Sequence, residues 1–218
     1  MSSQNTNRTR LMLVTPVIGD AAAFLPQLEA ALAAGDIAAI LLRPAPDDER
    51  SLINLIKELA PLVQAKGAAL VVETDATIAV RGGADGVHMS GQSDTIAAAR
   101  TTLKGERILG AGNLRARHDA MEAGEAGVDY VMFGEQREDG SWPPLSAMVE
   151  RAGWWAELFE TPCVVCAPDL ESVATLAETG AEFVALCAWA FADGADIAAT
   201  IQAAEAALAA TARPKVRA

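Results

Sequence analysis

The chain has 218 residues, of which 51% are hydrophobic, and its formal net charge at pH 7 is −12. This length suits a single domain, and the apolar fraction is large enough for a substantial core. An acidic surface disfavours nucleic acids and anionic membranes as partners, because the phosphates of both would be repelled. No apolar run reaches the roughly 18 residues that a membrane-spanning helix needs.

Eight apolar runs follow one another along the chain, and alanine-rich helical patterns separate them. Runs that are apolar on both faces are typical of parallel strands, which need crossover helices between them. The clearest helical patterns cover residues 20–34, 47–66 and 196–210. The predicted strands occupy residues 11–15, 39–43, 67–73, 86–88, 108–110, 130–134, 162–167 and 183–187.

A glycine followed within two residues by an acidic residue precedes four of these strands, at Gly35, Gly83, Gly127 and Gly180. The period of about fifty residues is twice what one strand and one helix need, so each repeat holds two strand–helix units. Eight such units predict a closed (β/α)8 TIM barrel, a single domain over residues 10–210. Residues 1–9 are predicted to be a disordered tail and 211–218 a C-terminal tail. A doubly wound open sheet is the competing fold, but the even repeat and the absence of an early G-x-G-x-x-G favour the barrel.

Active sites of such barrels lie at the carboxyl ends of the strands, so polar residues at those ends are candidate ligands. Arg43 ends the second strand. It is either an anion ligand or a partner in a rim salt bridge with Asp47, Asp48 or Glu49. Glu73 ends the third strand, inside or at the lip of the barrel, and either has a role in the site or in a buried polar network or has neither role.

Two aspartates are candidates for binding Mg²⁺, which prefers oxygen ligands and keeps waters for a phosphate partner. Asp75 follows the third strand and either binds a metal or caps the next helix, which is the role we favour. Asp94 follows the fourth strand and is either a second metal carboxylate or a first-turn residue of its helix.

Three further features lie near the predicted mouth. His88 can contact a phosphate or shuttle a proton, or it can be a hydrogen-bonded structural histidine. Asn113 is a polar mouth residue or, as we favour, the cap of the following helix. The segment 135–144 reads EQREDGSWPP and contains Arg137. As the longest polar loop it is either a lid over the site or a solvated loop.

Cys163 and Cys166 have the C-x-x-C spacing of a redox or metal pair. They fall within one predicted strand, however, so alternation sends them to opposite faces and they cannot share a metal or a disulfide. We expect buried thiols. Together with Cys187 the count is odd, and the polar start of the chain does not resemble a secretory signal. Both features indicate a reducing cytoplasm.

Five segments together resemble thiamine-phosphate synthase, and the related thiazole tautomerases share its barrel. The segments are LMLVTP at 11–16, LLR at 41–43, GADGVHM at 83–89, AGVDYVMFG at 126–134 and TGAEFVAL at 179–186. The resemblance implies an enzyme that joins hydroxymethylpyrimidine pyrophosphate to thiazole phosphate and releases pyrophosphate. It also implies self-association, with a homodimer as the expected form, and Mg²⁺ at the leaving group. A departing pyrophosphate needs a metal and cationic side chains to stabilise its developing charge.

The chain departs from the family pattern at most ligand-binding positions. The metal-binding aspartate of the third-strand N-D-R is Thr74 here. The Gly-Gly after the seventh strand, whose amides hold the thiazole phosphate, is Ala167-Pro168, and proline has no N–H to donate. Other replaced positions are Leu41 and Ala45 within Q-x-R-x-K, residues 112–114 in place of S-x-H, the 135–144 loop without T-x-T-K, and Ala188 in place of serine. Asp94 matches its aspartate only across one extra residue.

We therefore expect a diverged homologue in thiamine-related metabolism whose partner is a phosphorylated small molecule. A non-catalytic binding or regulatory barrel, and a different enzyme acting on a phosphorylated metabolite, are the alternatives. Catalysis is predicted at Arg43 and His88, with Mg²⁺ at Asp94 if the enzyme is active. The predicted substrate-binding residues are Arg43, Glu73, His88, Asn113 and Arg137.

Overall fold

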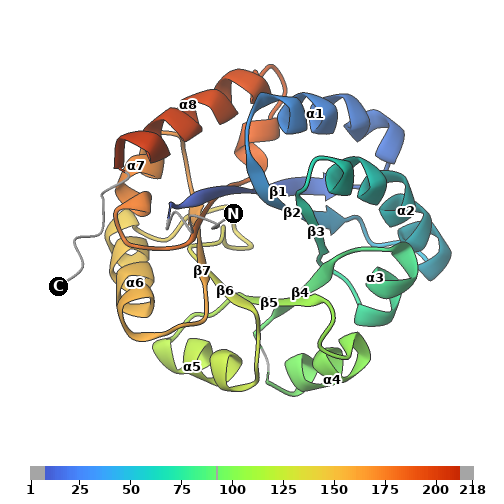
Figure 1. Ribbon diagram of the computed structural model, residues 1–218, viewed down its shortest axis with the longest axis horizontal. Coiled ribbons are helices and arrows are strands. Elements are labelled where there is room, and N and C mark those ends of the chain that lie inside the picture. Colours follow the sequence, from blue (N-terminus) through green and yellow to red (C-terminus); the bar gives the residue numbers. More distant parts are fainter. Residues whose placement is uncertain (1–7, 92, 212–218) are drawn as a thin grey trace, which may run out of the picture.

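The computed structural model describes residues 8–91 and 93–211, apart from the side chains of residues 93 and 94, and is a ring of strands surrounded by helices (Figure 1). Its elements in chain order are β1 (Arg10–Ile18), α1 (Ala21–Ala34), β2 (Ile37–Pro44), α2 (Glu49–Ala65), β3 (Ala69–Val72), α3 (Ala76–Gly82), β4 (Gly86–Ser90), α4 (Ser93–Leu103), β5 (Ile108–Gly112), α5 (Arg117–Glu125), β6 (Tyr130–Phe133), α6 (Leu145–Leu158), β7 (Cys163–Ala167), α7 (Ser172–Ala177), β8 (Phe183–Leu186), the short 3-10 helix η1 (Ala188–Phe191) and α8 (Ile197–Thr211).

The strands of the described residues pair in parallel from β1 through to β8, and β8 returns to β1 to close the barrel. Leu11 lies opposite Val184 at this closure. The predicted (β/α)8 barrel is therefore confirmed, and the open sheet is wrong. β1 runs on past Pro16 to Ile18, and its pairing with β2 is irregular there because proline has no N–H for the ladder.

Glycine is required at the repeated turn for two different reasons. Gly83, Gly127 and Gly180 have φ of +86°, +83° and +89°, a backbone region that favours glycine. Gly35 instead has extended backbone, with φ of −167°. A Cβ at Gly35 would lie 2.7 Å from the side chain of Ile201, so the close approach of α8 excludes a larger residue there.

The acidic residue of the turn joins neighbouring strands at their amino ends. In three of the four copies its carboxylate accepts a hydrogen bond from the backbone N–H near the start of the preceding strand. The bonded pairs are Asp85 with Leu70 (2.7 Å), Asp129 with Leu109 (2.8 Å) and Glu182 with Cys163 (2.9 Å). The repeated motif thus links three pairs of strands, β3 with β4, β5 with β6 and β7 with β8.

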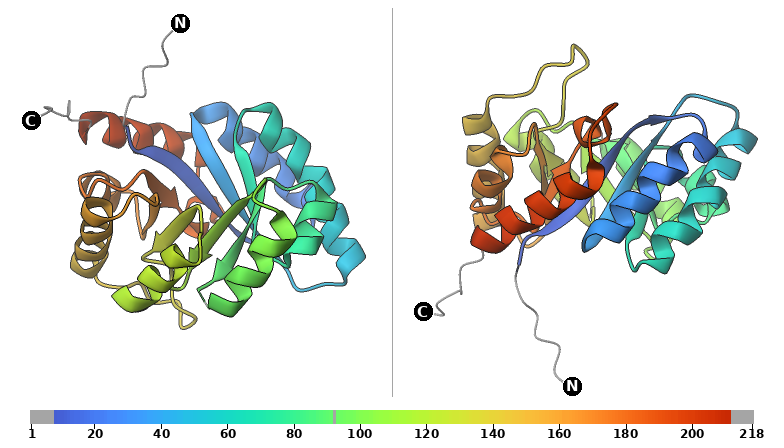
Figure 2. Two further views of the ribbon diagram at one scale, coloured as in Figure 1. Left: turned by 60° about the horizontal axis from the view of Figure 1, so that its bottom comes forward. Right: turned by 90° about the horizontal axis from the view of Figure 1, so that it is seen from above.

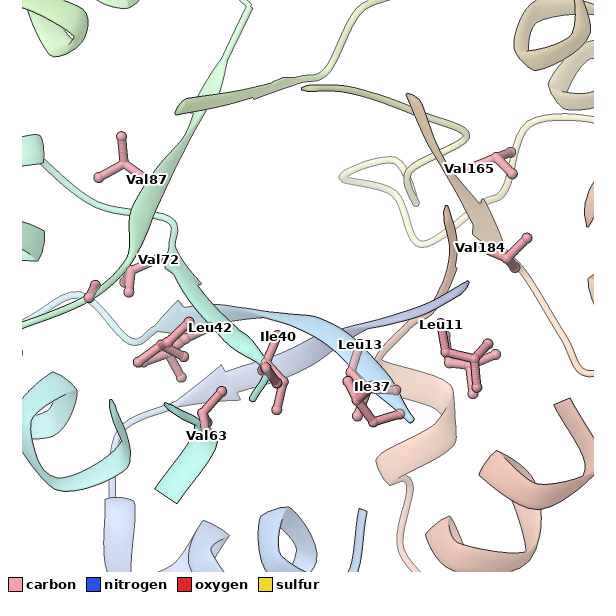
Figure 3. Packing of buried hydrophobic residues seen from close by; sticks show 14 of the residues in the cluster. Leu11, Leu13, Ile37, Ile40, Leu42, Val63, Val72, Val87, Val165 and Val184 are labelled. Carbon is pink, nitrogen blue, oxygen red and sulfur yellow. The ribbon is translucent and has the colours of Figure 1, made fainter. Parts of the chain in front are cut away.

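The strands are buried on both faces, as their continuous apolar runs predicted. One layer lies between strands and helices, and Figure 3 shows Leu13, Leu42, Val72, Val87 and Val165 in it, on the outer side of the ring. The other layer fills the barrel interior. It consists of Met12, Val14, Leu41, Val71, Tyr130, Met132, Val164, Cys166, Ala185 and Cys187.

The cysteines follow the predicted alternation. Cys163 packs in the outer layer and Cys166 in the barrel interior, so the C-x-x-C spacing forms neither a disulfide nor a shared site. Burial, followed by the nearby negative charge of Glu182, raises the pKa of the Cys163 thiol to about 12. Both observations support the prediction of buried, protonated thiols.

Aspartates cap the amino ends of α1 and α3, which follow the carboxyl ends of β1 and β3. The side chain of Asp20 accepts from the backbone N–H groups of Ala22 and Ala23 in α1. Asp75 accepts from the N–H of Thr77 at the start of α3. Both are N-caps, and for Asp75 this is the role favoured from the sequence.

The loop between β6 and α6 stands out from the carboxyl end of the barrel (Figure 2, right). Seen along the barrel, the same loop lies over the opening of the ring (Figure 1). In the described part of the chain, no helix is both long enough and apolar enough to cross a bilayer. The tails predicted at 1–9 and 211–218 fall almost entirely outside the described residues.

Candidate functional site

A cavity of about 800 Å³ opens at the carboxyl ends of the strands. The ends of β1 to β8 line it, together with the β5–α5 and β6–α6 loops and one face of α6. The structure brings five of the predicted site residues together on its wall, namely Arg43, Glu73, His88, Asn113 and Arg137. The side chain of Asp94 lies outside the described residues, so its predicted role as a metal ligand stays a prediction.

Arg43 is held by a carboxylate. Its Nε lies 2.9 Å from Oε2 of Glu73, and about half of each side chain is exposed. Arg43 therefore forms a rim salt bridge, but with Glu73 and not with any of the three predicted partners, and its role as an anion ligand stays a prediction. Asp48 caps α2, and Glu49 pairs with Arg81. An exposed pair of this sort contributes only about 0–1 kcal/mol, so an anionic ligand can displace Glu73 at small cost.

The oxygen donors at the end of β3 do not fit Mg²⁺. Glu73 is engaged by Arg43, Asp75 caps α3, and Thr74 stands between them. Among the residues whose side chains are described, no three histidines, cysteines or carboxylates come together as a metal site. Mg²⁺ usually keeps one or two protein carboxylates with open positions for phosphate, and at the end of β3 both Glu73 and Asp75 already have partners.

His88 lies at the floor of the cavity and is only 5% exposed. Its Nδ1 is 2.8 Å from the hydroxyl of Tyr130, and its Nε2 is 3.7 Å from Oε1 of Glu135. Burial, followed by the negative charge of Glu135, raises the pKa of Tyr130 well above its usual value. The phenol is therefore protonated at neutral pH. His88 is thus held between a buried neutral hydroxyl and a carboxylate at the mouth.

Glu135 is positioned by the backbone after β5. The N–H of Asn113 donates to its Oε2 at 2.7 Å, and Asn113 adopts a left-handed φ of +57°. Gly112 leaves space for the pair, because a Cβ there would lie 2.2 Å from Oε1 of Glu135 and 2.4 Å from Nε2 of His88. A residue with a side chain at position 112 would therefore separate the histidine from the carboxylate.

Asn113 does not cap α5, so the favoured prediction for it is wrong. The helix begins at Arg117, and the preceding Ala116 donates its N–H to Asp119. The short loop between β5 and α5 places Asn113 at the mouth, where its side-chain oxygen accepts from Nε of Arg115 at 3.3 Å. Asn113 instead lies on the cavity wall, which agrees with the alternative prediction of a polar residue at the mouth.

The loop at 135–144 is held together by its own hydrogen bonds. Arg137 donates its backbone N–H to the carbonyl of Ser141, and Gln136 donates its amide to the carbonyl of Gly140. The guanidinium of Arg137 reaches only Ser141 Oγ, at 3.2 Å, and the residue is exposed. Trp142 at the base of the loop packs against both apolar layers. The tip of the loop is thus stabilised by hydrogen bonds among its own residues, and its base is held by the packing of Trp142.

The ends of β7 and β8 offer apolar groups and thiols. Trp189 donates its indole N–H to the carbonyl of Ala167 at 2.7 Å. Cys166 and Cys187 line the cavity floor, and a hydrogen bond from the Cys166 thiol to Cys187 is the largest cause that raises the pKa of Cys166. Pro168 supplies no N–H for an anion.

A family model described as thiamine monophosphate synthase matches residues 11–189. The chain belongs to the thiamine monophosphate synthase family. A thiamine-phosphate synthase of Rhodospirillum centenum is 40% identical to it over 181 residues, which cover 82% of this chain and 87% of the relative. A thiamine-phosphate synthase of Hyphomonas neptunium is 34% identical over 205 residues, covering 88% and 91%.

Solved structures share the fold of this thiamine monophosphate synthase family member. The thiamine phosphate pyrophosphorylase of Pyrococcus furiosus superposes with a TM-score of 0.77 at 20% identity, over 94% of this chain and 98% of that one. A 3-hexulose-6-phosphate synthase gives a TM-score of 0.65 at 18% identity, over 90% and 99%. Both agree with the closed barrel.

Sequence reasoning missed the residues that surround His88. Glu135 follows the family's Phe-Gly pair directly, but it was considered only as part of a polar loop. Tyr130 is the single tyrosine of the chain and begins a strand, so its inward direction could have been inferred from alternation. Gly112 was noted as a departure from the thiamine monophosphate synthase pattern, without the consequence that it leaves room for Glu135.

Proposed function

We propose that the chain is a diverged homologue in thiamine-related metabolism that binds a phosphorylated small molecule at the carboxyl mouth of its barrel. Family membership supports the metabolic area. The cavity of about 800 Å³ lies within the size range of small-molecule sites, which are concave and carry a few converging polar groups. Fold alone does not determine function, so the chemistry has to be argued from the side chains at this mouth.

The observation that carries the proposal is the Arg43–Glu73 ion pair at the ends of β2 and β3. Arg43 is the cation that the chain keeps from the family pattern, and here a carboxylate neutralises it. Displacing a pyrophosphate requires strong stabilisation of negative charge by metal and cations. A resting site in which Glu73 neutralises Arg43 supports phosphate binding through Arg43 better than it supports that condensation.

The second candidate is thiamine-phosphate synthase activity itself. The relative from Rhodospirillum centenum, named for that activity, supports it with 40% identity over 82% of this chain. On this candidate the phosphates of the substrates and the side chain of Asp94 would complete a metal site.

One assay separates the two candidates. The protein is mixed with hydroxymethylpyrimidine pyrophosphate, thiazole phosphate and Mg²⁺, and released pyrophosphate is measured against a thiamine-phosphate synthase of known activity. We expect release at the level of a protein-free blank. Turnover comparable to the reference enzyme, lost on Arg43→Ala, would reject the proposal and establish the second candidate.

Ligand binding is measured separately by thermal denaturation with single phosphorylated compounds, beginning with hydroxyethylthiazole phosphate. A ligand present at a hundred times its dissociation constant stabilises a protein by about 2.7 kcal/mol. At roughly 2–4 °C per kcal/mol for a domain of this size, Tm should rise by about 5–11 °C. Arg43→Gln should remove most of that shift. No stabilisation by any phosphorylated compound would contradict the proposal.

The remaining expectations are proposals of the same kind. The net charge of −12 supports the absence of nucleic-acid partners. A homodimer and a cytoplasmic location are proposed from the family resemblance and the three unpaired cysteines.

A further inference from the structure

Two departures from the family pattern meet at His88. Gly112 stands at the first position of the segment that replaces S-x-H, Glu135 begins the loop that lacks T-x-T-K, and both lie at Nε2 of His88. A larger residue at 112 would occupy the space in which the carboxylate now lies. The two departures therefore fit each other sterically, which is unexpected if the mouth had merely lost its ligands.

The arrangement holds the carboxylate in one orientation. Oε2 of Glu135 is bound by the Asn113 N–H at 2.7 Å, so Oε1 is the oxygen that faces the histidine. The separation of 3.7 Å between Oε1 and Nε2 is longer than a hydrogen bond. Oε1 and Nε2 are therefore not hydrogen-bonded to each other, and each can exchange a proton with a ligand atom that lies between or beside them.

The protonation of the ring follows from its two neighbours. Tyr130 keeps its proton because burial opposes the phenolate. A carboxylate near Nε2 favours a proton on that nitrogen, and Nδ1 is then the acceptor of the Tyr130 hydroxyl at 2.8 Å. This assignment satisfies Nδ1 and leaves the proton of Nε2 directed toward Glu135 without a hydrogen bond. The other charged or titratable groups near the cavity floor are Arg43, Glu73, Cys166 and Cys187.

We propose that His88 and Glu135 are a catalytic acid–base pair that transfers a proton on a phosphorylated ligand, with Tyr130 and Gly112 as positioning residues. This inference rests on the proposed function, because it needs a ligand in the same cavity. The ligand class is a small phosphate ester that carries a C–H next to a C=O or C=N group.

The step uses no metal, oxidant or second substrate. Glu135 Oε1 takes the proton from carbon, the electron pair of that C–H bond forms the new carbon–carbon double bond, and Nε2–H of His88 donates its proton to the oxygen or nitrogen. Because the oxygen or nitrogen gains this proton, the resulting enol or enamine carries no charge there. The reverse transfers return a proton to carbon and the other proton to Nε2. General acid–base catalysis of this kind contributes about 10²–10⁴-fold to a rate.

A first experiment tests the pair without any ligand. The chain has two histidines, and His118→Gln leaves the His88 ring as the one observed in a long-range ¹H–¹⁵N correlation spectrum. We expect the neutral ring to carry its proton on Nε2. Tyr130→Phe and Glu135→Gln should each shift the ring toward a mixture of tautomers. A purely structural histidine with its proton on Nδ1, unchanged by Glu135→Gln, would overturn the inference.

A second experiment measures proton transfer. Hydroxyethylthiazole phosphate and dihydroxyacetone phosphate are incubated with the protein in D₂O, and loss of carbon-bound ¹H signals is followed by NMR. We expect deuterium to enter at least one probe, at a rate lowered at least 100-fold by Glu135→Gln and by His88→Gln. Glu157→Gln, on the exposed side of α6, is the matched control and should leave the rate unchanged.

The thermal shift produced by the same probes separates the two possible failures. A probe that stabilises wild type and Glu135→Gln equally, yet exchanges at the rate of the blank or equally fast in both, contradicts the acid–base pair and leaves phosphate binding intact. If neither probe stabilises the protein or exchanges, the proposed function fails and this inference fails with it.

Discussion

Replacing Gly112 by alanine tests the geometry on which the acid–base pair depends. The added methyl group would lie 2.2 Å from Oε1 of Glu135 and 2.4 Å from Nε2 of His88, where contact distances are normally above about 3.4 Å. Both contacts are too short, so each partner must move by about 1 Å. Glu135 can leave its place, whereas His88 is 5% exposed and bound to Tyr130, so the shift of its ring should also disturb that hydrogen bond.

The cost in stability should be moderate. Overpacking a filled site typically costs about 1–3 kcal/mol. Glu135 is a flexible side chain on a loop, and the exposed N–H of Asn113 that it releases can bind water, but the buried His88 ring must shift as well, so the whole of this range applies. At roughly 2–4 °C per kcal/mol, the Tm should fall by about 2–12 °C. The same variant should lose the preference of the His88 ring for a proton on Nε2.

Gly153→Ala is the matched control for this change. Gly153 lies inside α6, and the nearest atom to an added Cβ is the Thr179 carbonyl oxygen at 3.9 Å. Alanine is favoured over glycine in a helix by about 0.5–1 kcal/mol, so the control should raise Tm. A Gly112→Ala protein with unchanged Tm and an unchanged His88 spectrum would refute the steric reasoning, since it would mean that the methyl group is accommodated without moving either partner.

Three further predictions concern the scaffold. Asp129→Ala removes the carboxylate that accepts from the buried N–H of Leu109 at 2.8 Å, so urea denaturation should show a loss of about 1–3 kcal/mol in the free energy of unfolding. Equal urea midpoints for the variant and the wild type would contradict the role of the acidic residue in the repeated turn. Hydrogen bonds from Ser51 lower the pKa of Asp48, so its contribution is present above its unfolded pKa and is lost as pH falls through the lower folded value. Asp48→Asn should therefore reduce the loss of unfolding free energy below about pH 4, and identical slopes would disprove this. The raised pKa values of Cys163 and Cys166 keep both as thiols, so iodoacetamide at pH 8 should label them in urea but not in the native protein.

The scaffold could be predicted because its signals are local and repeated. Gly83, Gly127 and Gly180 need a left-handed backbone, which is a property of the residue itself. The paired carboxylates of Asp85 and Asp129 reach a strand only one unit away. The residues of each repeat therefore specify its own turn and strand pairing. Eight apolar runs of strand length are then compatible with few folds other than a closed barrel.

The candidate site could be predicted only in outline. Strand ends placed Arg43, Glu73 and His88 at one mouth, but they did not indicate which side chains would pair. The partner of Arg43 lies thirty residues away rather than in the adjacent acidic run, since the ends of β2 and β3 meet at the rim. Asn113 was expected to cap a helix that in fact begins four residues later, at Arg117.

The amino-acid sequence by itself determined the ring of parallel strands, the buried thiols and the family to which the chain belongs, because periodicity and turn chemistry act between near neighbours. The tertiary structure alone decided that Glu135, Gly112 and Asn113 come together at His88. Those contacts join the ends of β4, β5 and β6, and their distances depend on how the barrel closes, which no local pattern specifies.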